Sequence, residues 1–245
     1  MKALILAAGY GTRLYPLTKT YPKALLKVGR KAIIDYIIDK LFAIREINEI
    51  IVVTNSRFFS YFKEWAASLR QQKALTLIDD LTDTLEGRRG AVGDMDFAIQ
   101  EKRIRDDLLV IGGDNLFDGS LGGFLEFARG QKKSPVIGAF DIGVKSEAAK
   151  YGVIKLDKHS RVTDFREKPL KPQSTLVGMC LYYFPKEKLR LIREYLERRR
   201  GRPDATGFYI GWLKDRTEVY GYRFRGRWFD IGDHKFYRQA SLSFA

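Results

Sequence analysis

The sequence is poor in the residues that build several kinds of site. It has one cysteine, Cys180, and two histidines, His159 and His234. A single thiol excludes an internal disulfide framework, and we expect Cys180 to pack in the core because it lies within an apolar run. Neither histidine has another histidine or a cysteine at metal-ligand spacing, so we expect both on the surface rather than in a zinc site.

The sequence also lacks a long apolar run. No stretch approaches the roughly 20 residues that a membrane-spanning helix needs, and the apolar N-terminal stretch is shorter than the roughly 7 to 15 residues of a signal-peptide core. Together with the lone cysteine, these absences predict a cytoplasmic protein that has no membrane partner.

Acidic residues are in the minority, with 30 Asp and Glu against 44 Lys and Arg and a formal net charge of +14. Such a charge fits either a nucleic-acid-binding protein or a basic surface around a site for small phosphorylated ligands. The basic residues are dispersed among acidic and polar ones, and no helix-turn-helix, zinc-finger or RNA-binding signature is present. We therefore expect no nucleic-acid partner.

What the sequence does contain, over its first half, is an alternation of short apolar runs with helical patterns. The 245 residues are 45% hydrophobic, enough for the core of one domain. The expected strands are 3–8, 49–55, 74–79 and 107–115, and the expected helices are 32–44, 58–70 and 94–100. Strand and helix in alternation predict βαβ units and a parallel sheet.

The second half changes to strands joined by short turns such as "DKHS" (157–160). The expected strands are 134–142, 151–157, 161–169, 174–185 and 217–233, with a helix over 186–200 and a short helical tail. This pattern predicts an antiparallel or mixed continuation of the sheet. The fold class is therefore α/β, with a Rossmann-like, mixed, mainly parallel central sheet flanked by helices. Because no linker composition appears, we expect one domain over 1–245.

The glycine loop "AAGYGTR" (7–13) follows the first expected strand. It lacks the Walker A pattern, and Leu14 stands where the third glycine of a dinucleotide-binding loop belongs. By themselves, Gly9 and Gly11 fit either a tight turn or a nest of N–H groups around a phosphate. The cations Arg13 and Lys23 favour a polyphosphate site. Since ligands sit beyond the carboxyl ends of parallel strands, we expect this loop and "GGDN" (112–115) to meet at one edge.

Six motifs follow one another in an order that resembles the sugar-1-phosphate nucleotidyltransferases, also called NDP-sugar pyrophosphorylases. They are the loop with its continuation to "PK" (22–23), then "GGDN", "YGVI" (151–154), "FREKP" (165–169), "VGMCLYYF" (177–184) and "WFDIGD" (228–233). The chain looks like a short form of the glucose-1-phosphate thymidylyltransferase and uridylyltransferase type. The resemblance implies a nucleotide-binding half at about 1–118 and a sugar-phosphate-binding half at about 134–245.

The resemblance also implies roles for individual residues in binding an NTP. The loop residues Ala8, Gly9, Gly11, Thr12 and Arg13 would hold the triphosphate. Lys23 would act beside the reacting phosphate, and Asp114 and Asp230 would bind the Mg²⁺ cofactor. Gly90, Gly93 and Asp94 occupy the segment that meets the base in this family, although their match is too loose to name the base.

For the sugar-1-phosphate, the resemblance assigns Glu167 to sugar hydroxyls and Lys168 to the phosphate. Gly152 and Gly178 would allow the backbone to approach the sugar. Arg13, Lys23 and Lys168 are then the expected catalytic residues. In-line attack on the α-phosphorus mainly requires positioning and charge neutralisation, so neither a covalent nucleophile nor a general base is needed.

Other interpretations stay open. A cytidylyltransferase for an alcohol phosphate such as inositol-1-phosphate or phosphocholine would use the same chemistry, although "EKP" and "YGVI" argue against phosphocholine. A non-catalytic regulatory module that binds nucleotide sugars is a second alternative. In longer relatives, extra C-terminal helices build an effector site and oligomer contacts. Because the sequence shows no such helices, we expect no feedback site here, and a homo-oligomer is left open.

We expect Asp118 and Asp233 to serve as turn or cap residues. Trp228 is expected to pack beside the Asp230 strand.

Overall fold

The computed structural model describes residues 1–69, 73–198 and 205–244. The ends of two expected helices, at 70 and at 199–200, lie outside these ranges. The chain forms two compact units, the first from 1–104, 111–118 and 227–245 and the second from 105–110 and 119–226. The chain therefore leaves the first unit and returns to it twice.

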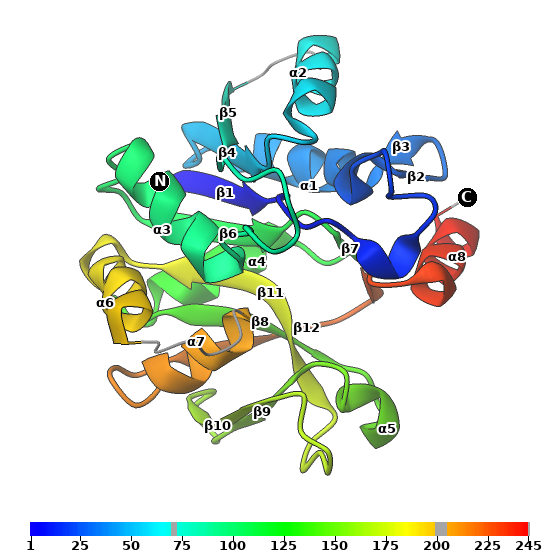
Figure 1. The fold of residues 1–245 in the computed structure, drawn as a ribbon. Coiled ribbons are helices and arrows are strands. Elements are labelled where there is room, and N and C mark those ends of the chain that lie inside the picture. Colours follow the sequence, from blue (N-terminus) through cyan, green and yellow to red (C-terminus); the bar gives the residue numbers. More distant parts are fainter. Residues whose placement is uncertain (70–72, 199–204, 245) are drawn as a thin grey trace. The chain divides into compact units, whose positions relative to one another are not determined.

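Among the described residues of the first unit, three strands pair in parallel. β1 (Lys2–Leu6) pairs with β4 (Glu49–Thr54), which pairs with β5 (Ala74–Asp79), and the three run side by side in Figure 1. Helices α1 (Ile33–Phe42), α2 (Phe59–Ser68) and α3 (Ala91–Glu101) lie between or after these strands in the chain. The βαβ units and the parallel pairing expected from the apolar runs are confirmed.

Helix α1 shows how the sequence specifies these elements. Its aliphatic residues recur at helical spacing and are all buried: Ile33, Ile34, Ile37, Ile38 and Leu41. Asp35 in its first turn accepts a hydrogen bond from the backbone N–H of Ala32 (2.9 Å) and another from Trp65 Nε1 (2.8 Å). The carboxylate thus satisfies an N–H group at the helix start, where a negative charge is favourable.

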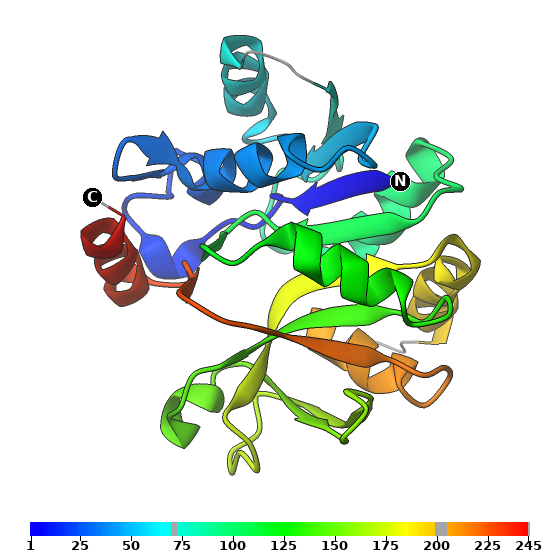
Figure 2. The ribbon, with the colours of Figure 1, turned by 180° about the vertical axis from the view of Figure 1, so that it is seen from behind.

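The last segment of the chain completes the first unit. β13 (Trp228–Asp230) pairs antiparallel with β7 (Asn115–Phe117), and α8 (His234–Ser243), drawn in red, follows it (Figure 2). A small core joins residues far apart in the chain: Leu14, Leu26, Val28, Ile33, Leu116, Ile231 and Ala240. One expected strand over 217–233 is wrong, because the chain turns at Gly226 (φ 93°) and forms two strands in its place.

The second unit has a mixed sheet. β8 (Val136–Asp141) pairs antiparallel with β11 (Leu176–Phe184) and parallel with β12 (Tyr220–Phe224). β9 (Gly152–Leu156) and β10 (Val162–Glu167) form an antiparallel hairpin. β6 (Leu108–Gly112) carries the chain from this unit into the first. The expected α/β class, with a mixed and mainly parallel sheet, is confirmed.

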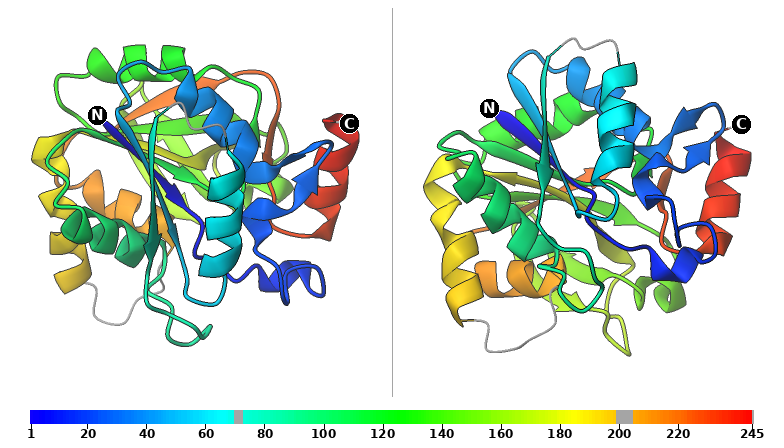
Figure 3. Two further views of the ribbon diagram at one scale, coloured as in Figure 1. Left: turned by 90° about the horizontal axis from the view of Figure 1, so that it is seen from above. Right: turned by 45° about the horizontal axis from the view of Figure 1, so that its top comes forward.

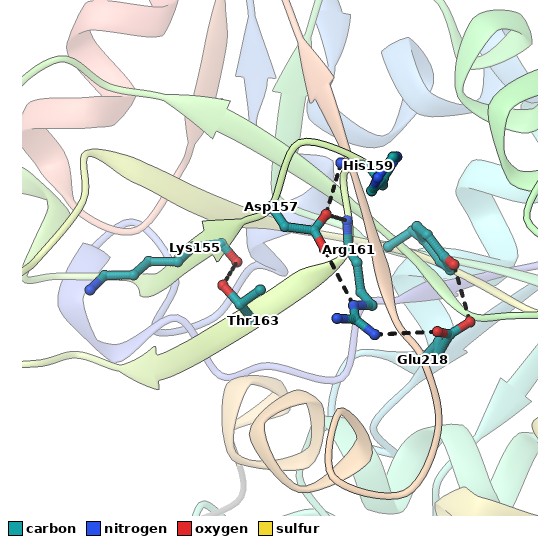
Figure 4. Close-up of polar contacts among 7 residues, drawn as sticks. Lys155, Asp157, His159, Arg161, Thr163 and Glu218 are labelled. Atoms are coloured by element: carbon teal, nitrogen blue, oxygen red, sulfur yellow. Dashed lines mark hydrogen bonds and ion pairs between the residues drawn. The ribbon is translucent and has the colours of Figure 1, made fainter.

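The turn between β9 and β10 is built by one carboxylate (Figure 4). Asp157 accepts hydrogen bonds from the backbone N–H groups of His159 and Arg161, both at 2.9 Å. The guanidinium of Arg161 reaches Asp157 Oδ2 (3.3 Å) and Glu218 Oε1 (3.4 Å). An aspartate bonding to the backbone two residues on is a turn former, so "DKHS" turns as expected. His159 is exposed, also as expected.

The described residues of the second unit form four helices: α4 (Leu121–Arg129), α5 (Lys145–Ala148), α6 (Arg190–Arg198) and α7 (Thr206–Leu213). The α6 and α7 helices pack side by side, drawn in yellow and orange in Figure 3. Sequence analysis missed α4 and α7, because each carries two glycines and α7 is apolar all round. None of the helices in the described ranges combines the length and the hydrophobicity needed to span a bilayer.

Candidate nucleotide and acceptor sites

Two side chains hydrogen-bond to the backbone of the glycine loop, and the space beside Gly9 is free for a ligand. Asn55 Nδ2 donates to the carbonyl of Ala8 (2.8 Å), and Thr18 Oγ1 donates to the carbonyl of Gly11 (2.7 Å). Gly11 has a left-handed backbone (φ 61°), which a glycine adopts without strain. A Cβ atom at Gly9 would meet nothing within 4 Å, so a ligand has room to approach the backbone there.

Two short 3-10 helices lie at the end of the loop and after it, and their positions decide which side chains are buried and which are exposed. The first, η1 (Thr12–Leu14), buries Leu14 and leaves Thr12 and Arg13 exposed. The second, η2 (Lys23–Leu25), follows Pro22 and directs Lys23 to an ion pair with the carboxylate of Asp114. The side chains of Lys23 and Asp114 are 17% and 25% exposed, so the pair is largely withdrawn from solvent.

A backbone hydrogen bond joins the "GGDN" motif to the end of β1, directly before the glycine loop. Gly113 donates its N–H to the carbonyl of Leu6 (2.8 Å), and a Cβ atom at Gly113 would lie 2.9 Å from the same oxygen. The carbonyl of Asp114 accepts from the N–H of Ile231 (3.1 Å), which follows Asp230. The two motifs therefore meet, as the sequence predicted.

Asp230 comes to the same place through the pairing of β13 with β7, in which it lies opposite Asn115. Burial alone would lower the pKa of Lys23, but the attraction of Asp114 and Asp230 outweighs it, and the pKa is raised. A Cβ atom at Gly232 would lie 3.1 Å from Arg13 Nη2, so the guanidinium also reaches this segment. The structure thus brings together Arg13, Lys23, Asp114 and Asp230.

The charges of this cluster fit a hard divalent cation. Within the described ranges, no group of three or more His, Cys, Asp or Glu could hold a metal. Mg²⁺ does not need one, because it is commonly held by one or two carboxylates together with water and phosphate oxygens. Asp114 and Asp230 would supply two carboxylates, and both already attract the ammonium of Lys23.

The segment expected to meet the base is built on a buried pair of acids. Gly90 (φ 79°) precedes α3, and Asp94 in its first turn is only 5% exposed because it faces Asp80, which is 1% exposed. Asp80 accepts from the N–H and hydroxyl of Thr82 (2.8 and 2.7 Å) and hydrogen-bonds with Asp94. Ionised carboxylates only accept hydrogen bonds, so a hydrogen bond between these two acids requires one of them to carry a proton.

The environment of Asp80 supports that protonation. Burial raises its pKa, although the hydrogen bonds from Thr82 oppose the shift. Arg89, on the approach to Gly90, donates from Nε to the carbonyl of Asp80 (2.6 Å), and a Cβ atom at Gly93 would lie 3.0 Å from Arg89 Cβ. Sequence analysis missed Asp80; its only signal is an acid directly after an apolar strand.

The residues expected to bind the acceptor lie in the second unit. Lys168 follows β10 with a left-handed backbone (φ 44°), and its N–H donates to the carbonyl of Tyr151 (3.0 Å). Its Nζ lies 3.7 Å from Glu167 Oε1; the Glu167 side chain is 10% exposed and that of Lys168 60%. Burial raises the pKa of Glu167, and the attraction of Lys168 partly offsets the rise. A non-glycine residue at positive φ is strained, and such strain clusters at functional sites.

Two glycines expected near the sugar have different surroundings. A Cβ atom at Gly152 would overlap the ring of Phe165 and lie 3.1 Å from Glu167 Oε2, so this glycine makes room for side chains. At Gly178 a Cβ atom would meet only ordinary contacts at 3.7 Å and beyond. The register of β11 against β8 shifts after Gly178, and Cys180 in this bulge has φ 51° and is half-buried. The expectation that Cys180 packs in the core is wrong, because the bulge turns it partly outward.

A comparison with known families agrees with this geometry. The family model described as "Nucleotidyl transferase" matches residues 2–245. The chain belongs to this family. Its fold also superposes on the structure titled a "Putative Glucose-1-Phosphate Thymidylyltransferase" from Bacillus anthracis in complex with a sucrose. The TM-score is 0.84 at 23% identity, over 99% of this chain and 94% of that one.

Among curated proteins, this nucleotidyl transferase is 30% identical over 245 residues to a "Putative mannose-1-phosphate guanyltransferase" of Sulfolobus acidocaldarius. That match covers 99% of this chain and 62% of the other. It is 27% identical over 235 residues to the "Bifunctional protein GlmU" of Methanocaldococcus jannaschii, covering 95% of this chain and 51% of that protein. The chain thus spans between half and two thirds of the length of these relatives.

In this nucleotidyl transferase, Asp233 has the capping role and Trp228 the packing role that the sequence predicted, whereas Asp118 pairs with Arg227 instead of forming a turn or a cap. Asp118 accepts hydrogen bonds from the N–H (2.7 Å) and Nε (2.9 Å) of Arg227, and Asp233 caps α8 by accepting from the N–H of Phe236 (3.0 Å). Trp228 donates from Nε1 to Asn115 Oδ1 (2.7 Å), which ties β13 to β7 beside Asp230. His234 is exposed, as expected.

Proposed function

We propose that this nucleotidyl transferase joins an NTP to a sugar-1-phosphate and gives an NDP-sugar and pyrophosphate, with Mg²⁺ as cofactor. The observation that carries the proposal is the cluster of Arg13, Lys23, Asp114 and Asp230 beside an open glycine loop. Two cations suit a triphosphate, and two carboxylates suit the metal that accompanies it. The names of the relatives from Sulfolobus and Bacillus support a sugar phosphate as acceptor.

The residues of the first unit would prepare the nucleotide for attack. The backbone around Gly9 can approach the phosphates closely, and the Arg13 guanidinium can grip two of their oxygens at once. Lys23 provides a point charge that remains cationic because Asp114 and Asp230 attract it. Mg²⁺ held by Asp114 and Asp230 would neutralise further charge on the triphosphate.

The residues of the second unit would present the acceptor. Glu167 accepts hydrogen bonds from sugar hydroxyls when it is ionised, and Lys168 pairs with the phosphate. An acceptor phosphate oxygen then forms a bond with the α-phosphorus, and the bond from that phosphorus to the bridging oxygen breaks, so that its electron pair leaves with pyrophosphate. A phosphate monoester is already an anion near neutral pH, so this step needs no general base.

Pyrophosphate release tests the proposal. The purified chain is incubated with Mg²⁺ and each of dTTP, UTP, CTP, GTP and ATP, against glucose-, mannose-, N-acetylglucosamine- and inositol-1-phosphates and phosphocholine. We expect one strong combination, which must contain a sugar-1-phosphate. Activity only with CTP and inositol-1-phosphate or phosphocholine would replace the sugar by an alcohol phosphate. A folded protein that is inactive in every combination would favour the binding module.

A pair of matched variants tests the assigned carboxylates. Asp114→Asn removes a proposed metal ligand at almost constant size, and we expect pyrophosphate release to fall by two orders of magnitude or more, as when one electrostatic contact to a transition state is lost. Asp39→Asn removes an exposed carboxylate of α1 that pairs with Lys31, and we expect it to leave the rate unchanged. Equal rates for the two variants would overturn the metal assignment.

A further inference from the structure

Helix α7 begins against the carboxylate of Glu167. A Cβ atom at Gly207, in the first turn of this helix, would lie less than 3.0 Å from Glu167 Oε2 and 3.0 Å from Phe165 Cε1. Cβ atoms do not approach other heavy atoms so closely, so Glu167 can occupy its position only while residue 207 is glycine. Gly207 is buried within a helix, so the requirement is for space and not for an unusual backbone.

A second glycine leaves room for the same oxygen of Glu167. A Cβ atom at Gly152, on β9, would lie 3.1 Å from Oε2. The other carboxylate oxygen, Oε1, lies 3.7 Å from Lys168 Nζ. Backbone from β9 and α7 therefore confines one oxygen, while the other faces the cation that is expected to bind the acceptor phosphate. A carboxylate held in this way has little freedom to rotate.

The start of α7 is fixed in turn by a buried hydrogen bond. Tyr182 Oη donates to Thr206 Oγ1 (2.9 Å), and the Tyr182 ring stacks on Phe184 with a centroid distance of 5.8 Å. Tyr182 is 4% exposed, and burial raises its pKa well above the ordinary value, so it stays a neutral donor. Tyr182 comes directly after the β11 bulge, so the bulge sets where this donor lies.

We propose that Thr206 and Gly207 are positioning residues for acceptor binding, which act by fixing the carboxylate of Glu167. The inference rests on the proposed function, because it takes Glu167 as the group that accepts from acceptor hydroxyls. The substrate class it implies is a phosphate ester whose ring hydroxyls lie where this one carboxylate orientation can accept from them. A carboxylate that is displaced or turned would lose those hydrogen bonds and leave nucleotide binding untouched.

The two glycines of α7 supply a matched test. Gly207→Ala adds a methyl group that must push Glu167 away. Gly211→Ala adds the same group one turn later, where its nearest neighbour is the carbonyl of Phe165 at 3.7 Å, an ordinary contact. Both changes replace a helical glycine by alanine, so their effects on helix propensity cancel in the comparison.

We expect Gly207→Ala to weaken acceptor binding at least tenfold and to leave the NTP dissociation constant within twofold, while Gly211→Ala changes neither. Calorimetry measures both constants directly, with the acceptor of the strongest pyrophosphate-releasing combination or, without turnover, with glucose- and mannose-1-phosphate. Circular dichroism and thermal unfolding verify that both variants fold. Equal acceptor binding by the two variants, or no acceptor binding by the wild type, would overturn the proposal.

A second pair of variants tests the hydrogen bond and does not depend on Gly207. Thr206→Val keeps the shape but removes the oxygen that Tyr182 needs, and Thr206→Ser restores it. We expect acceptor affinity to fall at least threefold in Thr206→Val and to recover in Thr206→Ser. Loss in both, or in neither, would contradict a positioning role. If the wild type binds acceptor but releases no pyrophosphate, the proposed function fails while these affinities still judge the positioning of Glu167.

Discussion

The ammonium group of Lys23 is paired with the carboxylate of Asp114, 91 residues away in the chain. Asp230 attracts the same ammonium. The two acids that we propose as metal ligands thus have an internal counter-ion. A divalent cation that binds between them must compete with Lys23 for Asp114, and the displaced ammonium is then available to a phosphate group.

Removing this counter-ion is therefore expected to have opposite effects on metal binding and on turnover. We predict that Lys23→Met binds Mn²⁺ about tenfold more tightly than the wild type in the absence of nucleotide, a difference of about 1.4 kcal/mol. Its pyrophosphate release is expected to fall. Electron paramagnetic resonance of free Mn²⁺ measures the first effect. Lys27→Met, at an exposed position nearby, is the control, and unchanged Mn²⁺ affinity in Lys23→Met would contradict the competition.

Acceptor binding is predicted to weaken as the pH falls. Burial raises the pKa of Glu167, with Lys168 opposing the shift, so Glu167 becomes protonated at a higher pH than an ordinary glutamate. The neutral acid accepts less well, so the KM for the sugar-1-phosphate rises as the pH drops through the raised pKa. The acceptor phosphate itself titrates near pH 6. The acceptor phosphate titrates in the same way when Glu167→Gln is assayed, but this variant has no carboxylate at residue 167. The KM of the variant is therefore expected to vary less with pH than that of the wild type. Parallel pH profiles would contradict the assignment.

The Asp80 and Asp94 pair predicts a pH dependence of stability. Because the pKa of Asp80 is raised in the folded state, the folded protein binds its proton more tightly than the unfolded chain. That contribution to stability is complete at low pH and is lost as the pH rises through the raised pKa. Asp94→Asn supplies an N–H donor in place of the shared proton. We expect its free energy of unfolding to decline less than that of the wild type as the pH rises above the ordinary pKa of an aspartate.

Urea unfolding at several pH values measures this difference, and Asp96→Asn, on the same helix, is the control. Asp96 is half-buried and accepts from Gln100 Nε2 at 3.3 Å. If Asp94→Asn and the wild type lose stability in parallel as the pH rises, the two acids do not share a proton.

The hydrogen bond from Trp228 to Asn115 is predicted to stabilise the strand pair that carries Asp230. Trp228→Phe keeps an aromatic ring but removes the Nε1 donor, and Asn115 is only 2% exposed. Losing one such bond costs about 1 kcal/mol or somewhat more. We expect a lower midpoint of urea unfolding and weaker Mn²⁺ binding. Full stability together with unchanged Mn²⁺ affinity would show that β13 does not depend on this contact.

The sequence could predict those parts of the molecule whose determinants are local. The strands β1 and β4 are short, mainly apolar runs, and the burial of their central residues follows from that composition. Gly11, Lys23 and Asp114 could be found because turns, cations and strand-end acids have recognisable chemistry. The resemblance to one family then placed Glu167 and Lys168.

Other features depend on distances that no local pattern contains. Gly207 matters only because Glu167 lies beside it, and α7 has no amphipathic period that would reveal the helix. Asp80 gains its role from Asp94 on the following helix. The bulge that leaves Cys180 half-buried arises from the pairing of β11 with β8, which the sequence of β11 alone does not specify.

The path of the chain between its two units has a consequence for biosynthesis. The first unit takes its last strand and helix, β13 and α8, from residues 227–245. During translation, the parallel strands and the glycine loop are therefore synthesised well before Asp230, the second proposed metal ligand. A nonsense codon anywhere in 119–226 would leave a polypeptide that has its nucleotide loop but only one of its two proposed metal ligands.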